Sequence, residues 1–302
     1  MIEKPIIRNK VRHMSKIPFF QRKRVRDLTL AVPSIVWILF LIIFPMIFTI
    51  IISFASRNVY GKVLYDWNIN NYLRFLDPLY LNILLRSLRL GLESMLICLL
   101  IGYPLAYYIA RSPKKKKTIL LILVIAPFWT NLLIRAYSWM LILRNTGIIN
   151  VFLQWTKIIN EPLHLLYNDG AILTGLVYIF LPFMILPLYA TIEKLDWSLL
   201  EAASDLGAND FRTFRHVTLP LTMPGIVAGS ILVFIPAFGS FVIPSMLGGA
   251  KSMMIGNLIE NQFKESRNWP FGAATAVILI LSALVAIMFY VRWTGTGEER
   301  EV

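Results

Sequence analysis

The chain has 302 residues, of which 57% are hydrophobic and only 16% charged, and its mean hydropathy is +0.65. A soluble domain carries about 25% charged residues, so this composition, with its apolar residues collected in long runs, excludes a soluble globular protein. The formal net charge of +13 does not indicate nucleic-acid binding, because no groove-reading motif accompanies it and the basic residues flank hydrophobic runs.

The first predicted elements are a basic cytoplasmic tail over 1–27 and a transmembrane helix over 28–54. That apolar run is much longer than the hydrophobic region of a secretory signal, so we expect it to be retained. An external loop over 55–82 follows, and the chain ends in a cytoplasmic tail over 294–302.

Five further spans are expected between these segments, at 83–110, 118–144, 170–192, 226–249 and 271–293. Each exceeds the roughly 20 residues that cross the hydrocarbon core. Lipid cannot satisfy exposed backbone groups, so each span should be a helix. The expected fold class is therefore an all-α integral membrane protein with six transmembrane helices, five of them forming a core over 83–293.

The distribution of basic residues predicts the orientation of these spans. With the N-terminus inside, 19 Lys and Arg residues lie on the cytoplasmic side and 8 on the external side. Cytoplasmic loops carry this excess in membrane proteins, so we expect both termini in the cytoplasm. The external loops are rich in Asn, Tyr and Trp, which either anchor span ends at the interface or form a docking face.

One cytoplasmic loop, over 193–225, differs from the others because it holds five acidic residues and three basic ones. Its centre predicts a short amphipathic helix with Asp196 as N-cap and Gly207 as the stop. The apolar face has helical spacing and consists of Leu199, Ala202, Ala203 and Leu206. Small alanines on this face permit the close approach of another protein's backbone.

The same loop carries a longer motif. Glu201-Ala202-Ala203 is followed after three residues by Gly207 and after nine more by Val217-Thr218-Leu219-Pro220. This pattern resembles the EAA motif of the inner-membrane permeases of binding-protein-dependent ABC importers, with Val217 where the motif has Ile. The resemblance extends over roughly residues 30–290 and implies a type I ABC importer permease fold.

In that family the loop is the coupling helix, which sits in a cleft of a separate ATPase subunit. The coupling residues implied here are Glu201, Ala202, Ala203, Asp205, Gly207, Leu219 and Pro220. The resemblance also implies a non-catalytic, multi-pass subunit of a bacterial cytoplasmic (inner) membrane. Its implied partners are two ATPase copies that hold ATP and Mg, a second homologous permease, and a soluble or lipid-anchored substrate-binding protein; this chain itself is expected to hold no cofactor or metal.

Four further stretches resemble the B-type permease of spermidine/putrescine importers in particular. They are residues 77–80, 127–131 with Arg135, 181–184 and 268–272. The resemblance implies a polyamine substrate, while importers of another small organic ion, iron or sulfate remain open because they share similar phrases.

Several residues inside the spans are candidates for the substrate pathway. Aromatic faces attract ammonium groups, and the candidates are Trp129, Tyr137, Phe238 and Phe241, with Asn131 on a polar stripe of the third span. Arg135 lies on that stripe and repels cations, so we interpret it as a structural or gating charge. Glu93 follows Arg86 and Arg89 on one helical face, which favours an internal ion pair over a ligand site. For each aromatic candidate, packing between helices is the alternative.

Two other function classes were considered. A secondary transporter driven by an ion gradient leaves the Glu-Ala-Ala loop unexplained. A membrane-embedded enzyme requires a catalytic constellation, and the sequence has one cysteine, three isolated histidines and no paired acids. The stretch Gly248–Ser252 lacks the glycine before lysine that a phosphate-binding loop requires, so ATP hydrolysis by this chain is not expected.

Overall fold

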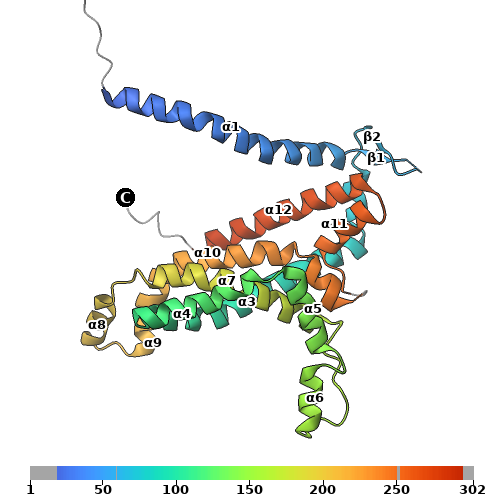
Figure 1. The fold of residues 1–302 in the computed structure, drawn as a ribbon. Coiled ribbons are helices and arrows are strands. Elements are labelled where there is room, and N and C mark those ends of the chain that lie inside the picture. The colour runs from blue at the N-terminus through green and yellow to red at the C-terminus, as the bar shows by residue number, and fades with distance from the viewer. Residues whose placement is uncertain (1–18, 59, 250–251, 295–302) are drawn as a thin grey trace, which may run out of the picture. The chain divides into compact units, whose positions relative to one another are not determined.

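The computed structural model describes residues 19–58, 60–249 and 252–294, so the predicted tail residues 1–18 and 295–302 lie outside the described residues. The chain divides into two units, residues 1–49 and 50–302. The first unit holds most of α1 (Phe19–Ser53), the long blue helix of Figure 1. This helix covers the predicted span over 28–54 except its last residue, and it begins earlier, within the basic segment.

The second unit opens with small elements. Strands β1 (Ser56–Arg57) and β2 (Val63–Leu64) pair antiparallel, with Ser56 opposite Leu64, and α2 (Asn70–Phe75) follows. The side-chain amide of Asn71 donates to the backbone carbonyls of Ser53 and Ala55, at 3.0 and 2.8 Å. The prediction of an all-helical fold therefore holds among the described residues apart from this one hairpin.

Three helices form the centre of the second unit: α3 (Pro78–Arg111), α7 (Asp169–Ile192) and α10 (Leu219–Phe238), which lie side by side in Figure 1. Asp77 caps α3 by accepting from the Leu79 N–H at 2.8 Å. Gly225 of α10 lies so close to α7 that a Cβ there would meet Thr191 Oγ1 at 2.6 Å. Small residues permit such close packing between membrane helices.

The prediction of one continuous helix over 118–144 is wrong. The structure has α4 (Lys114–Ile125), a 3₁₀ turn over Ala126–Trp129, α5 (Leu132–Leu143) and α6 (Ile148–Trp155). The two halves meet at 93°. The break has a local cause, because Pro127 lacks an N–H, Thr130 is extended, and Asn131 restarts the helix by accepting from the Leu133 N–H at 2.8 Å.

The predicted bounds of the fifth span, 226–249, are also wrong. A continuous helical stretch runs from Asp210 to Phe238, composed of α9 (Asp210–Thr213), a π turn over Phe214–Thr218 and α10. Pro220 removes a backbone donor, and the π turn lets the Leu219 N–H bond the Phe214 carbonyl instead. At the other end, the helix stops at Gly239.

The remaining elements are a π turn over Pro244–Gly248, α11 (Ile255–Lys264) and α12 (Trp269–Thr294). The last of these agrees with the predicted span over 271–293. Within the described ranges, four helices are long and apolar enough to cross a membrane, or five if the bent α4–α6 segment counts as one span. The predicted span over 83–110 corresponds to α3, which is not among these.

Candidate functional site

The helix expected in the 193–225 loop is present as α8 (Ser198–Asp205). Asp196 Oδ1 accepts from the Ser198 N–H at 3.0 Å, and hydrogen bonds from Ser198 hold the pKa of the Asp196 carboxyl below its ordinary value. At the other end Gly207 adopts φ +81. The Gly207 N–H bonds Ser204 O at 2.9 Å and the Ala208 N–H bonds Ala203 O at 3.0 Å, the paired bonds of a Schellman cap.

Most residues of α8 are exposed and none is buried, while Leu200, Glu201 and Ser204 border a pocket shared with the end of α3. Leu206, directly after the helix, is 89% exposed, and Glu201, Ala202 and Asp205 are exposed as well. Asp205 lies at the negative end of the helix dipole, where a carboxylate does not stabilise the helix. An apolar and acidic surface with so little burial fits one that another protein covers.

Leu219 and Pro220, the last two residues of the motif, begin α10, where Leu219 is half-buried and Pro220 exposed. They lie beyond the π turn rather than on α8, so the motif spans two helical elements. The π turn contacts α3 through Phe214, whose ring meets that of Tyr103 edge-on at 5.5 Å. Tyr103 Oη also forms a 3.0 Å hydrogen bond with Thr222 Oγ1 of α10.

A pocket of about 400 Å³ lies between α8, the π turn and the end of α3. It has both aromatic and charged walls. The lining residues are Tyr107, Arg111, Trp197, Leu200, Glu201, Ser204, Asp210, Thr213, Phe214 and Thr218.

The pathway candidates of the third predicted span gather at the 93° bend. Trp129 is 79% exposed and Tyr137 50% exposed. Asn131 is used as the cap of α5. Arg135 Nε and Nη1 are buried without a hydrogen-bond partner among the described residues, and the guanidinium carbon lies 5.7 Å from the Phe128 ring centre.

The two phenylalanine candidates differ in exposure. Phe238 is 1% exposed and stacks on Phe234 at 5.5 Å within the core, so in this conformation its ring offers no surface to a substrate. Phe241 lies just beyond α10 and is 43% exposed. The helix stop at Gly239 separates the two rings, which the predicted span over 226–249 had placed on one helix.

The charges of α3 form a network that sequence reasoning only partly anticipated. Arg89 Nε lies 3.6 Å from Glu93 Oε1, but Arg86 Nη2 contacts Asp169 Oδ1 at 2.5 Å rather than Glu93. Arg89 also pairs with Asp169, and Arg86 donates to Ser252 Oγ at 3.2 Å. This network joins α3 to the start of α7.

A family model described as "Binding-protein-dependent transport system inner membrane component" matches residues 102–293, well over half of the chain. The chain belongs to this family. It is therefore an inner-membrane component of a transport system, and the exposed α8 with its motif lies inside the matched region.

Individual relatives agree with this assignment. The permease is 45% identical over 260 residues to the spermidine/putrescine transport system permease protein PotB of Escherichia coli K12, covering 86% of this chain and 94% of PotB. It is 45% identical to PotB of Haemophilus influenzae (84% and 89% covered) and 37% identical to the inner membrane ABC transporter permease protein YdcU of E. coli K12 (69% and 70%).

Solved structures support the fold. The permease superposes with a TM-score of 0.74 on a chain of a bacterial ABC transporter involved in the import of the acidic polysaccharide alginate, at 18% identity and covering 92% of this chain and 99% of that one. The same type of transporter in complex with an alginate pentasaccharide-bound periplasmic protein gives 0.68 at 19% identity, with 92% and 98% covered. Helix order and packing therefore match an ABC importer permease.

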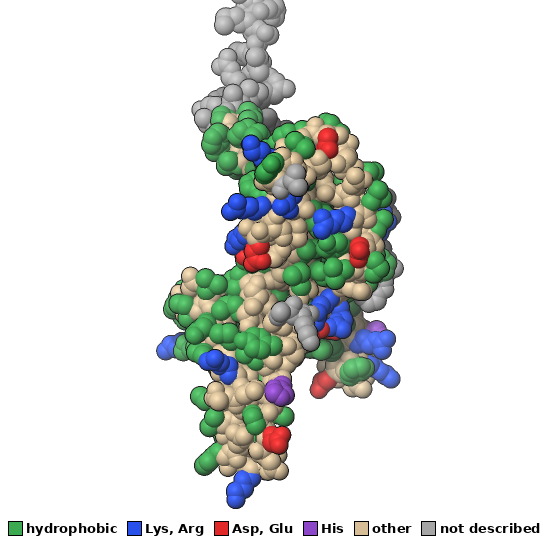
Figure 2. Space-filling model, turned by 90° about the vertical axis from the view of Figure 1, so that its right-hand side faces the viewer, with side chains coloured by type: hydrophobic (Ala, Val, Ile, Leu, Met, Phe, Trp, Pro, Cys, Tyr) green, Lys and Arg blue, Asp and Glu red, His purple; other side chains and the backbone are tan. Residues whose placement is uncertain are grey.

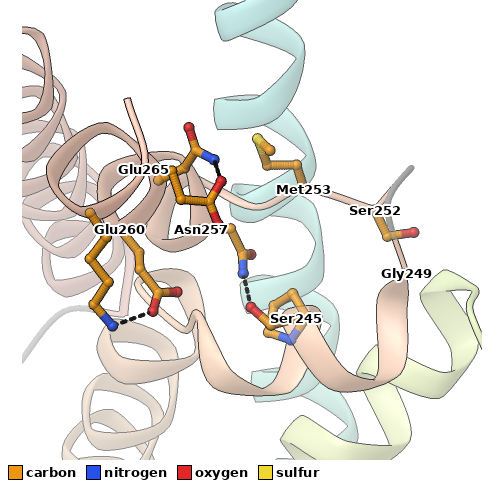
Figure 3. A pocket seen from close by; sticks show the side chains of 10 residues that line it. Ser245, Gly249, Ser252, Met253, Asn257, Glu260 and Glu265 are labelled. Atoms are coloured by element: carbon orange, nitrogen blue, oxygen red, sulfur yellow. Dashed lines mark hydrogen bonds and ion pairs between the residues drawn. The ribbon is translucent and has the colours of Figure 1, made fainter. Parts of the chain in front are cut away.

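The permease also has a polar pocket that sequence reasoning missed, of about 410 Å³ beside α11. Figure 3 shows its wall, in which Lys264 pairs with Glu260 at 2.8 Å and the Asn257 amide donates to Ser245 Oγ at 2.7 Å. Figure 2 shows one face of the molecule, on which acidic and basic side chains are interspersed with apolar ones. The only sequence signal was the amide-rich composition of the loop.

Proposed function

We propose that this permease is the membrane-spanning subunit of an ATP-driven importer that moves polyamines into the cytoplasm, with α8 as its coupling helix. The observation that carries the coupling role is that α8 has no buried residue and exposes Glu201 and Ala202 on a helix that ends at the left-handed Gly207. The substrate follows from the 45% identity to PotB over most of both chains.

The proposed topology has six spans with both termini in the cytoplasm. The bent α4–α6 segment is one span, and α3, with 34 residues, is long enough to be another. The pairing of Arg86 and Arg89 with carboxylates lowers the cost of placing these charges near or within the membrane. This orientation puts α8 and the basic start of α4 on the cytoplasmic side.

The proposed assembly contains this permease, a second homologous permease, two ATPase copies and a substrate-binding protein. ATP and Mg belong to the ATPase, and this chain carries out no hydrolysis. Closure of the ATPase pair would push α8 and shift the spans between outward-open and inward-open states, the form of alternating access that a rigid-body switch provides.

The proposed pathway uses exposed aromatic faces near the bend and beyond α10. Trp129, Tyr137 and Phe241 offer π faces to ammonium groups, while Phe238 is buried in the core and offers none in this conformation. Arg135 lies beside Phe128 and would repel a polycation, so we assign it a gating or structural role. Glu93 is engaged by Arg89 and serves structure rather than substrate binding.

The test reconstitutes the permease with its co-encoded ATPase, second permease and binding protein in proteoliposomes. Uptake and stimulated ATP hydrolysis are measured for spermidine, putrescine, an opine, sulfate and ferric ion. We expect stimulation by polyamines alone. If another compound stimulates ATP hydrolysis, the polyamine assignment is wrong but the importer function stands. If an ion gradient drives uptake without ATP, both assignments are wrong.

Variants of α8 test the coupling role in the same vesicles. Glu201→Ala should lower uptake about tenfold or more, because a hydrogen bond to a charged group contributes about 1.5–3 kcal/mol. Glu161→Ala, which removes an exposed acid on the opposite side of the proposed membrane, is the matched control and should leave uptake unchanged. Equal uptake by both variants would contradict the assignment of Glu201.

A further inference from the structure

The last residue of α3, Arg111, lies against the residue that precedes α8. Its guanidinium carbon is 5.3 Å from the ring centre of Trp197 and 5.7 Å from that of Tyr107. Arg111 Nη1 also donates to Tyr107 Oη at 3.4 Å, and the two rings meet edge-on at 5.9 Å. These three side chains, called here the α3 clamp, form one cluster that joins two segments about 90 residues apart.

The position of Arg111 follows from the chain on either side of it. Ser112 and Pro113 are both extended, so α3 ends there and α4 begins at Lys114. Tyr107 is one helical turn before Arg111, which puts both on the same face of α3. Trp197 is the N-cap residue of α8, so the clamp holds the coupling helix at its first turn.

The clamp is significant because α8 has little else to hold it. None of its residues is buried, and its packing partners are α9 and the π turn. A push on α8 can therefore reach the membrane along the backbone into α10 or across Trp197 into α3. Since α3 packs along both α7 and α10, the second route reaches all three core helices at once.

The nearby cations Lys116 and Lys117 make different contacts from Arg111. Lys117 pairs with Glu193 at 2.9 Å and joins α4 to the end of α7, without contact to α8. Lys116 sits over the ring of Tyr108, also on α3. Of these three cations, Arg111 is the one that lies over the ring of Trp197, the residue next to α8.

We infer that Arg111 is a positioning residue for transport: through Trp197 it keeps the cytoplasmic end of α3 moving together with α8 when the ATPase acts. The inference rests on the proposed function, because it takes α8 to be the coupling helix. A cation over two aromatic rings tolerates sliding better than a directional hydrogen bond, since the attraction to a ring face has no fixed angle. Such a contact suits a joint between moving helices.

The first test is the number of substrate molecules imported per ATP hydrolysed by the full complex in proteoliposomes. Arg111→Ala should assemble and hydrolyse ATP but import about threefold fewer molecules per ATP, and Arg111→Lys should recover most of the loss because it keeps the cation. Lys116→Ala, the matched control in the same basic segment, should keep the wild-type ratio. A wild-type ratio for Arg111→Ala, or equal losses in the two alanine variants, would overturn the inference.

A double-mutant cycle tests whether Arg111 acts through Trp197. If it does, Trp197→Ala and the double variant should have the same ratio of import to hydrolysis, because the second change removes nothing further. If the double variant instead loses the product of the two single losses in this ratio, the two residues act separately, which would contradict a role of Arg111 through Trp197.

A second measurement does not depend on the substrate. Spin labels at Ser204→Cys and Leu105→Cys, in a Cys98→Ser background, report the distance between α8 and α3 without nucleotide and with ATP–vanadate. The clamp predicts an unchanged distance in the wild type and a changed or broadened one in Arg111→Ala. If complexes show this pattern but polyamines do not stimulate ATP hydrolysis, the role of Arg111 stands and the polyamine assignment is wrong. If the distance in the wild type changes with nucleotide, the role of Arg111 is wrong.

Discussion

The core helices α3, α7 and α10 and the short helix α8 differ in what surrounds their side chains. The core helices bury residues along most of their length, among them Leu90, Leu188 and Phe238. In α8 no side chain is buried, and its ends are fixed instead by Asp196 and by the left-handed Gly207. The difference suggests that the core sequence is constrained by packing within the chain, whereas that of α8 is available for recognition by a partner.

The largest effect is expected where two core helices touch. In Gly225→Val, the new side chain would meet Thr191 and the Pro187 carbonyl within 3.0 Å, and overpacking of this kind costs up to about 3 kcal/mol. The measurement is the unfolding temperature of the purified complex. Gly239→Val, where a Cβ has only ordinary contacts at 3.7 Å, is the control, and an equal drop for both variants would contradict the close-packing argument.

The ion network of α3 should rank second. Asp169→Asn replaces the carboxylate that pairs with Arg86 and Arg89 by a neutral amide, and the loss of a hydrogen bond between charged groups costs about 1.5–3 kcal/mol. The unfolding temperature should fall more than in Glu161→Gln, which removes an exposed acid. Equal stability of the two variants would mean that the network contributes little.

A smaller and local effect is expected at the end of α8. Gly207 has open space around it, so only its backbone conformation resists substitution, by roughly 1–2 kcal/mol for a residue with a Cβ. Gly207→Val should weaken ATPase binding with little change in unfolding temperature, while Gly207→Asn, which tolerates this conformation, should bind nearly normally. Global destabilisation by Gly207→Val would erase the distinction between α8 and the core.

The smallest effect concerns the loop before α8. Hydrogen bonds from Tyr189 and Lys117 hold the pKa of Glu193 below its ordinary value of 4.5. Since the folded-state pKa is the lower one, this stabilisation is present above pH 4.5 and is lost as the pH falls through the folded-state value. The pair is partly exposed, so the contribution is below about 1 kcal/mol.

Glu193→Gln checks this prediction through unfolding temperatures at neutral pH and below pH 4.5. The variant should be slightly less stable than the wild type at neutral pH and should converge with it in acid. A constant gap between the two proteins would contradict the role of Glu193.

Prediction from the sequence succeeded where one local rule decides the structure. The apolar run of α7 has this property, and its predicted bounds agree with the structure within one residue. The short helix α8 ends before Gly207 as predicted, but its N-cap residue is Trp197 rather than the predicted Asp196. It failed at the bend near Pro127 and at the ends of the 226–249 span, because hydropathy does not report where a backbone donor is missing. Asp169 was missed because its partners Arg86 and Arg89 lie in another helix, and such pairing depends on tertiary contacts.

The most direct test of the coupling role of α8 is the thiol-labelling rate of Leu206→Cys. Leu206 is 89% exposed, whereas the native Cys98 is fully buried and should not react. We predict rapid labelling of the permease alone and strong protection on addition of the ATPase, with Ile158→Cys, also on an exposed site, labelled equally in both. Unchanged labelling of Leu206→Cys in an assembled, active complex would contradict the assignment of α8 as the surface that receives the ATPase.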